Sequence, residues 1–259
     1  METIRIDIDD RGVATLTLAR SEKHNALSAQ MMDELTEAAR NLGADPAVRV
    51  VILAAEGASF CAGGDLGWMR AQFDTDAAGR DVEARRLANM LRALNEMPKP
   101  LIGRVHGNAF GGGVGMACVC DIAIAADTAL FGLTETRLGL IPATIGPYVL
   151  ARMGEAMARR VFMSSRRFGA DEAVTLGIVA KSVAADDLDA AVEAEVAPYL
   201  SCAPGAVAEA KALARRLGPP INDQVIDDTI AALAQRWESS EAVEGIGAFF
   251  DKRKPQWQS

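Results

Sequence analysis

A run of three glycines, Gly111 to Gly113, constrains this chain more than any other feature. In "GNAFGGGVGMACVCDIAIAAD", residues 107–127, it stands directly before a stretch of small, mostly apolar residues. Glycine loses more backbone entropy on folding than any other residue, so three in succession need a compensating use. If a helix of small residues starts here, its first N–H groups lack intrahelical partners, and a ligand oxygen can approach them because no Cβ intervenes. The alternative is close packing of the helix against a strand.

The hydrophobic pattern on both sides of this run predicts an α/β fold. Apolar runs at 48–54, 101–105 and 122–126, interrupted only by Arg49 and Arg104, are typical of strands that are covered on both faces. Alternating segments at 3–8 and 13–18, separated by "DDRG", predict a hairpin. Further elements are expected as helices at 28–42, 81–95, 113–120, 145–153 and 170–176 and as a strand at 178–183. Strands and helices therefore alternate, as in α/β proteins.

The last quarter of the chain has a different pattern. Strand signals disappear after about residue 190, and apolar residues recur at helical spacing in 207–217 and 226–237, with Pro219 and Pro220 between them. Such a tail either packs on another subunit or folds back on its own core, and the sequence leaves both alternatives open.

Composition excludes several classes of protein. The net charge of −8 argues against nucleic acid or an anionic membrane as the main partner. The N-terminus alternates apolar and charged residues, so no secretory signal is expected, and no apolar run is long enough to span a membrane. The four cysteines lack CxxC spacing, and there are two histidines. We therefore expect reduced cysteines, no metal site and a cytoplasmic protein.

A second loop has the same character as the glycine run. "EGASFCAGGDLGWM", residues 56–69, places Ala62, Gly63 and Gly64 before Asp65 and follows a buried strand. Ligand sites of α/β proteins lie at such strand ends. The alternative is a plain turn in which Asp65 caps a helix. The glycine patterns do not match a dinucleotide or Walker fingerprint, and neither GxSxG nor HExxH is present.

Taken together, the two loops resemble those of the crotonase (enoyl-CoA hydratase/isomerase) family, and the similarity covers almost the whole chain. "SFCAGGDL" and "GNAFGGGVG" resemble the two oxyanion segments of the family. "CDIAIAADTALFGLTETRLGLIP" matches the stretch that carries its glutamate, and "AFFDKRKP" resembles its C-terminal signature. The resemblance implies a spiral of ββα units over residues 1–195 and a helical trimerisation region over 196–259. It also implies a homotrimer or a dimer of trimers.

The resemblance assigns roles to particular residues. The backbone N–H groups of Ala62 and Gly112 would form an oxyanion hole, and Glu135 would be the general acid/base. Without the resemblance, a surface glutamate paired with Arg137 is the simpler reading of Glu135. Contacts to an acyl-CoA thioester are expected from Lys23, His24, Ala26, Ala62, Gly63, Gly64, Asp65, Leu66 and Gly112, and Lys252 or Lys254 of a neighbouring subunit would lie near the phosphates. Coenzyme A is part of the substrate, so no separate cofactor is expected.

One position departs from the family pattern. Typical hydratases have a second glutamate where this chain has Gly115, and a single acid favours a Δ3-Δ2 enoyl-CoA isomerase. However, the segment from the glycine run to "IPATIGPYVL" closely resembles a bacterial branch of methylglutaconyl-CoA and related branched-chain hydratases, which also lacks that glutamate. We therefore expect a hydratase, with the isomerase as the alternative and a non-catalytic or RNA-binding member as a more distant one.

The acyl specificity is expected to come from the residues after Asp65 and from the loop 141–148. Trp68 and Met69 suit an apolar acyl group, although they suit a protein core equally well. For a glutaconyl-type substrate, Arg70 and Arg137 are the candidate basic residues near the acyl end.

Overall fold

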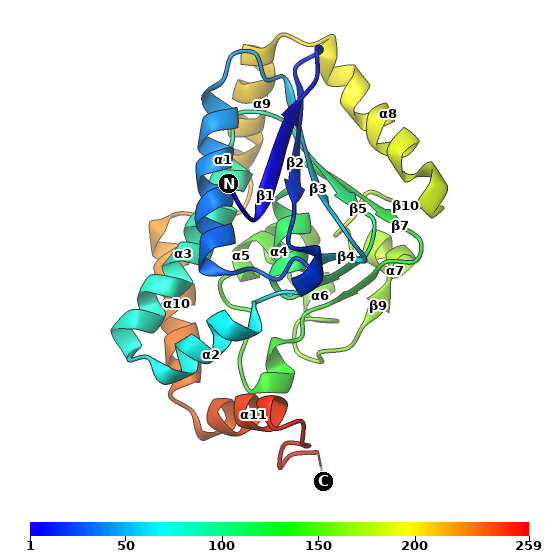
Figure 1. Cartoon of the computed structure of the whole chain (residues 1–259). Coiled ribbons are helices and arrows are strands. Elements are labelled where there is room, and N and C mark those ends of the chain that lie inside the picture. Colours follow the sequence, from blue (N-terminus) through cyan, green and yellow to red (C-terminus); the bar gives the residue numbers. More distant parts are fainter. Residues whose placement is uncertain (259) are drawn as a thin grey trace.

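The chain winds through repeated strand–strand–helix units, and the computed structural model describes residues 1–258 of it. Within these residues the first strand of each unit joins a six-stranded sheet and the second joins a four-stranded sheet (Figure 1). The pairs of strands are β3 (Val50–Ala55) with β4 (Ser59–Cys61), β5 (Leu101–Val105) with β6 (Asn108–Phe110), and β7 (Ile122–Ala126) with β8 (Leu130–Gly132). The expected α/β spiral of ββα units is confirmed.

The larger sheet has the order β1-β2-β3-β5-β7-β10. Its first two strands, β1 (Ile4–Ile8) and β2 (Val13–Leu18), form the antiparallel hairpin that the sequence predicts. The other neighbours are parallel, up to β10 (Lys181–Val183) at the far edge. The long apolar runs of the sequence are therefore the strands of this sheet.

The smaller sheet has the order β4-β6-β8-β9, with β9 (Phe168–Gly169) antiparallel to β8. Because β4, β6 and β8 are parallel neighbours, their carboxyl ends meet at one edge of the sheet. The loops that start there are 62–65, 111–113 and 133–135. The hydrophobic pattern does not predict these strands, because each has three residues and is too short for a periodic signal.

The helices largely follow the sequence pattern. In α1 (Ala29–Ala44), the Ser28 hydroxyl caps the first turn by accepting the Met31 N–H at 3.2 Å, as expected. The Arg-rich helix is α3 (Ala77–Glu96), and an unexpected short helix, α2 (Leu66–Asp74), precedes it. The glycine run opens α4 (Gly112–Val119), which is buried along its whole length. Other short elements are η1 (Ser21–Lys23), η2 (Glu135–Leu138), α5 (Gly146–Met153), α6 (Glu155–Ala158), α7 (Ala170–Thr175) and η3 (Ala185–Asp187).

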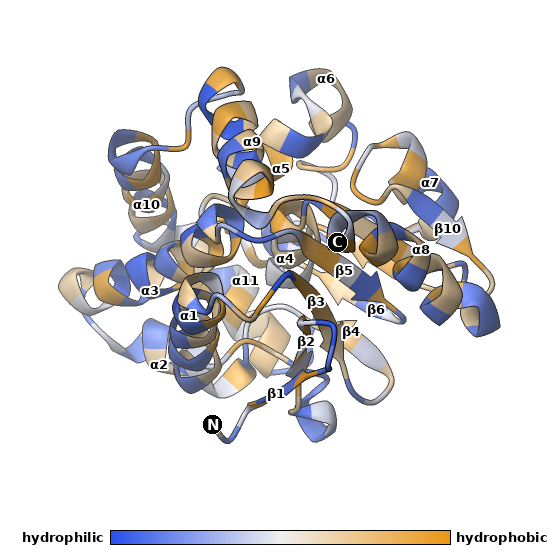
Figure 2. Ribbon diagram, turned by 90° about the horizontal axis from the view of Figure 1, so that it is seen from above, coloured by the Kyte–Doolittle hydropathy of each residue, from blue (hydrophilic) through white to orange (hydrophobic). Residues whose placement is uncertain are grey.

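The core lies on both faces of the larger sheet, and in Figure 2 the central strand β3 is apolar while the outer helices α1 and α3 carry both polar and apolar residues. One face packs against α1, α3 and α4. The other face packs against α8 (Leu188–Leu200), where Val50 and Ile124 of the sheet share a buried cluster with Leu188 and Val192. Residue 195, the expected end of the spiral core, lies inside this helix.

The tail consists of α9 (Pro204–Leu217), α10 (Asp223–Trp237) and α11 (Ser240–Phe250). Helix α10 packs along α3 with Ile226 and Ile230 buried against Ala84 and Ala88 (Figure 1). Helix α11 packs over η2, where Ala242 and Ile246 cluster with Leu140. Helices α10 and α11 therefore fold back on the core of their own chain. Helix α9 differs, because its side chains Leu213 and Leu217 are 44% and 77% exposed.

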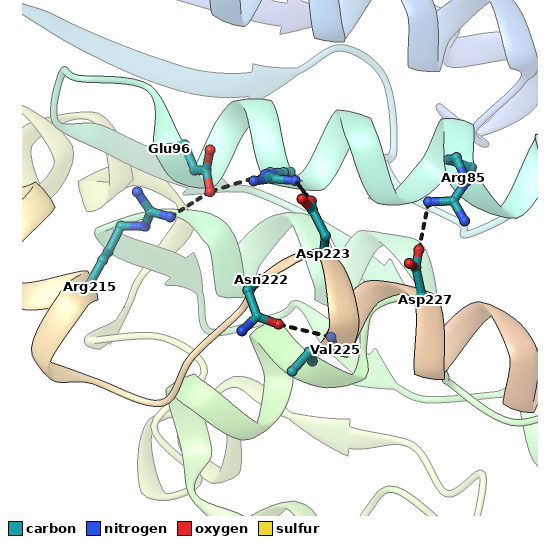
Figure 3. A network of polar contacts seen from close by, with 8 residues as sticks. Arg85, Glu96, Arg215, Asn222, Asp223, Val225 and Asp227 are labelled. Atoms are coloured by element: carbon teal, nitrogen blue, oxygen red, sulfur yellow. Dashed lines mark hydrogen bonds and ion pairs between the residues drawn. The ribbon is translucent and has the colours of Figure 1, made fainter.

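Polar contacts between α3 and α10 fix how these two helices lie (Figure 3). Arg85 donates to Asp227 at 2.8 Å, and Arg92 bridges Glu96 of its own helix and Asp223. Exposed ion pairs contribute little stability individually. These ion pairs matter because they position α10 on α3. Helix α10 carries Leu233 and Trp237, whose side chains form one wall of the cavity described next.

Candidate active site

A cavity of about 340 Å³ opens at the edge where β4, β6 and β8 end. Loop residues Gly64, Gly112 and Glu135 form one wall of it. The remaining walls are mainly apolar, and the side chains that form them include Leu27, Met32, Leu66, Trp68, Met69, Leu87, Ile141, Ile145, Leu233 and Trp237. The cavity therefore combines backbone amides and one carboxyl group with a largely apolar lining, the usual composition of a small-molecule site.

The two glycine loops contact each other and the glutamate. Gly111 has φ +48° and Gly63 has φ +95°, a backbone region that favours glycine. A Cβ at Gly111 would lie 3.0 Å from Glu135 Oε1 and 3.9 Å from the Cα of Gly63. Both glycines thus allow backbone and carboxyl groups to approach more closely than a side chain would permit.

The free amides of this wall are those of Gly64 and Gly112. Within residues 1–258, neither N–H group donates a hydrogen bond to the protein. The Ala62 N–H, by contrast, donates to the His24 carbonyl at 3.0 Å, so the expected oxyanion role of Ala62 is wrong. The Gly64 N–H is free because of how Leu27 pairs with Gly64. This pairing engages the carbonyl of Gly63 and the N–H of Asp65, and it leaves the Gly64 N–H without an acceptor.

Glu135 begins η2, directly after the loop that follows β8. Its Oε2 is buried and accepts no hydrogen bond from the part of the chain that the structure describes. Burial raises the pKa of this carboxyl to about 7, although the backbone N–H groups of Glu135 and Thr134 act in the opposite direction. Such a pKa suits proton transfer near neutral pH. Arg137 forms no ion pair with Glu135 among the described residues, so the alternative of a surface ion pair is wrong.

The position of the missing second glutamate is filled by apolar side chains. A Cβ at Gly115 would lie 2.6 Å from Ile145 Cγ2 and 3.6 Å from Leu91 Cδ2. A carboxylate at this position would therefore have no space unless Ile145 moved.

Of the residues expected to contact coenzyme A, Ala62, Gly63, Gly64, Leu66 and Gly112 line the cavity, whereas Lys23, His24, Ala26 and Asp65 do not. His24 lies against β4, with Nδ1 3.2 Å from the Ser59 hydroxyl. The Asp65 side chain caps α2, because it accepts the N–H groups of Gly67 and Trp68, and it pairs with Arg20. The cap that the sequence analysis kept as an alternative for Asp65 is therefore present.

Three residues expected to set the acyl specificity, Leu66, Trp68 and Met69, line the cavity. Arg137 also lines it, but Arg70 does not, because its guanidinium lies 4.7 Å above the ring of Phe250. Three polar lining residues carry no signal in the sequence, namely Gln72, Arg80 and Arg167. They lie on α2, at the start of α3 and directly before β9, where no motif distinguishes them from surface residues.

Three further observations concern the residues that the structure describes. They contain no group of three or more His, Cys, Asp or Glu side chains that could bind a metal ion. Their cysteines are unpaired, with Cys202 exposed and Cys61, Cys118 and Cys120 buried. None of their helices is both long and apolar enough to cross a membrane.

Comparison with known proteins gives a consistent result over the whole chain. The family model described as "Enoyl-CoA hydratase/isomerase" matches residues 9–259. A probable enoyl-CoA hydratase of Mycobacterium leprae is 33% identical over 265 residues, which cover 99% of this chain and 98% of the relative. The crystal structure of an enoyl-CoA hydratase from Shewanella pealeana has a TM-score of 0.81 at 39% identity, with 98% of this chain and 96% of that chain covered. A putative enoyl-CoA hydratase from Mycobacterium avium paratuberculosis has a TM-score of 0.85 at 33% identity, with 98% and 100% covered.

Proposed function

Because the chain belongs to the enoyl-CoA hydratase/isomerase family, we propose that it is a lyase that adds water to the 2,3 double bond of a 2-enoyl-CoA thioester. The observation that carries this proposal is the buried Oε2 of Glu135, which has no hydrogen-bond partner among the described residues and lies beside a glycine loop that presents an unbonded amide. An apolar cavity with these groups is suited to proton transfer beside a thioester carbonyl.

The two amides would stabilise the charge that develops on the thioester oxygen. Addition at C3 converts the acyl group into an enolate, in which that oxygen carries negative charge. The N–H groups of Gly64 and Gly112 are the donors available to it. Each fixed donor of this type is worth roughly 2.7–4 kcal/mol in the transition state.

Glu135 would transfer the protons. Its carboxylate accepts one proton from water while the water oxygen bonds to C3, and the protonated carboxyl then gives a proton to C2 of the enolate. One water molecule is consumed, and the glutamate returns to its starting state. The reverse sequence eliminates water.

The isomerase is the second candidate, and one observation favours it. The apolar filling at Gly115 leaves Glu135 as the only carboxyl group among the described residues that line the cavity. A single carboxyl suffices to take a proton from C2 of a 3-enoyl-CoA and return it to C4. A non-catalytic binding protein would have no use for such a carboxyl group.

For the acyl group, we propose a branched chain that ends in a carboxylate, as in methylglutaconyl-CoA. Arg80 lines the cavity with a side chain that is 13% exposed. Its guanidinium pairs with Glu238 and donates to the Thr75 carbonyl at 2.6 Å, while its Nε is buried without a partner in the described part of the chain. Gln72 lines the same cavity with an unpartnered Oε1. A guanidinium binds carboxylates well, and an unpaired buried donor is costly unless a ligand satisfies it.

We further propose a homotrimer or a dimer of trimers. The support is the apolar surface that α9 leaves exposed at Leu213 and Leu217. In that assembly Lys252 or Lys254 of a neighbouring subunit would lie near the phosphates of coenzyme A, and Lys23, His24 and Ala26 near its adenosine. No separate cofactor is part of the proposal.

A panel of thioesters tests the proposal. Loss of the 2-enoyl absorbance with crotonyl-CoA or methylglutaconyl-CoA is expected for a hydratase, and its appearance from a 3-enoyl-CoA would identify an isomerase instead. Glu135→Gln should keep its affinity for acetoacetyl-CoA and lose most turnover. If no CoA ester binds or reacts, the catalytic proposal is wrong.

A further inference from the structure

If hydration uses only one carboxyl group, the attacking water lacks a second hydrogen-bond acceptor that would fix its orientation. Glu135 can take one of its hydrogens, but a water fixed by a single hydrogen bond is free to rotate and to leave the line of attack. The usual second carboxylate has no space, because Ile145 fills the position next to Gly115. A further polar group near Ile145 would complete the site. The inference below rests on the proposed hydratase function.

Thr144 is a polar residue with no bonding partner for its hydroxyl in the structure. It is 5% exposed, and its Oγ1 is buried without a hydrogen bond in the described part of the chain. It also lines the same cavity as Glu135. Burying a hydroxyl without a partner is costly, and most such groups in proteins are bonded to protein or to ordered water. A threonine here rather than a valine therefore indicates a bound polar partner in the cavity.

Thr144 and Glu135 line the same cavity, and the first turn of α4 lies next to Glu135 and to Ile145, the residue after Thr144. A Cβ at Gly111 would lie 3.0 Å from Glu135 Oε1, and a Cβ at Gly115 would lie 2.6 Å from Cγ2 of Ile145, the next residue after Thr144. Gly111 and Gly115 are one helical turn apart, since the Gly115 N–H donates to the Gly111 carbonyl at 3.2 Å. One turn is roughly 5–6 Å along the axis. Glu135 and the segment Thr144–Ile145 therefore lie beside the same helical turn at the edge of one cavity.

The other two threonines beside Glu135 are less suitable. The Thr136 hydroxyl is already bonded, to Ser165 Oγ at 2.6 Å and to the Met163 carbonyl at 3.1 Å. Thr134 lines the cavity, but its hydroxyl is not among the buried groups without a partner, so no desolvation cost marks it. Thr134 therefore serves as a matched comparison.

We propose that the Thr144 hydroxyl holds the attacking water against Glu135, in place of the absent second acid. The water donates one hydrogen to the Glu135 carboxylate and the other to Thr144 Oγ1, which leaves a lone pair of its oxygen directed at C3 of the substrate. Thr144 takes no proton in the reaction, because both transfers pass through Glu135. It is a positioning residue for water.

Thr144→Val and Thr144→Ser test the proposal. Thr144→Val should lower kcat for hydration roughly 10- to 100-fold, with KM and the affinity for acetoacetyl-CoA unchanged, because the missing contact is made to water and not to the thioester. Its melting temperature should equal or exceed that of the wild type, since the substitution removes a buried hydroxyl without a partner. Thr144→Ser keeps the hydroxyl and should restore most of kcat.

Several outcomes would overturn the proposal. One is hydration by Thr144→Val within threefold of the wild type. Another is a loss of kcat that Thr144→Ser does not restore, or one that comes with a lower melting temperature and weaker acetoacetyl-CoA binding, since these mark a packing role. A large loss in Thr134→Val but not in Thr144→Val would assign the water to Thr134. If the wild type hydrates no enoyl-CoA, the proposed function fails, and this inference fails with it.

Discussion

At the scale of the residue, Glu135 has the clearest physical signature. Its carboxyl is buried without a charged partner, so the neutral form is favoured and the pKa rises from 4.5 to about 7. The motif "LTETRLG" gives only the position of this residue. Its environment comes from Gly111, which leaves room for the carboxyl, and from apolar residues that line the same cavity.

The pKa of Glu135 predicts the pH dependence of hydration. The base form is the carboxylate, so kcat/KM should rise as pH increases through about 7 and level off above it. Initial rates with a 2-enoyl-CoA between pH 5 and 9 measure this profile. A profile that is flat across pH 6–8 would contradict the assignment of Glu135 as the base.

The same pKa predicts a change in stability. Between pH 4.5 and about 7 the folded state keeps a proton that the unfolded state has lost, so the free energy of unfolding should fall as pH rises across this window and stay level above it. Glu135→Gln removes this contribution and should be more stable than the wild type at pH 8 by roughly 3 kcal/mol. Urea unfolding of both proteins at pH 5 and pH 8 measures the difference, and an equal gain at both values would contradict it.

At the scale of the element, the start of α4 explains the three glycines, and each has its own reason. Gly111 approaches the glutamate with a positive φ, Gly112 offers a free amide, and Gly113 packs against the backbone of β4. The sequence left two explanations of the glycine run open, an amide accessible to a ligand and close packing against a strand. Both apply, but to different glycines of the run.

This difference predicts contrasting effects of substitution. A Cβ at Gly113 would lie 2.5 Å from the Cys61 carbonyl, so Gly113→Ala should lower the free energy of unfolding by roughly 1–3 kcal/mol or more. A Cβ at Gly112 meets the end of the flexible Leu27 side chain, so Gly112→Val should keep the fold but lose activity as its side chain blocks the amide. Thermal unfolding and turnover of both variants test the contrast, and wild-type turnover by Gly112→Val would contradict the role of its amide.

At the scale of the whole molecule, the tail has two roles. Helices α10 and α11 close the cavity with Leu233, Trp237 and Phe249, and they pack on their own chain. Helix α9 exposes Leu213 and Leu217 on its surface. These two side chains are one helical turn apart, so the proposed subunit contact would cover both of them.

The exposed face of α9 predicts the behaviour of the protein in solution. Light scattering should give a molar mass of three or six times the 27.4 kDa of the chain. The double substitution Leu213→Glu, Leu217→Glu should shift the population towards smaller species at the same concentration. A wild type that is monomeric at micromolar concentration would contradict the trimer, and an unchanged mass for the variant would place the interface elsewhere.

The sequence by itself determined the strands of the larger sheet, most helices and the position of Glu135. Long apolar runs and helical spacing are local, and a motif gives the position of a residue directly. Tertiary structure decided which amides are free, because the Ala62 N–H donates to the His24 carbonyl, whereas the pairing of Leu27 with Gly64 leaves the Gly64 N–H without an acceptor. It also decided that Ile145 fills the space beside Gly115, and that Arg80, Gln72 and Thr144 line the cavity. These facts depend on contacts between segments far apart in the chain, and such contacts leave no periodic or local signal in the sequence.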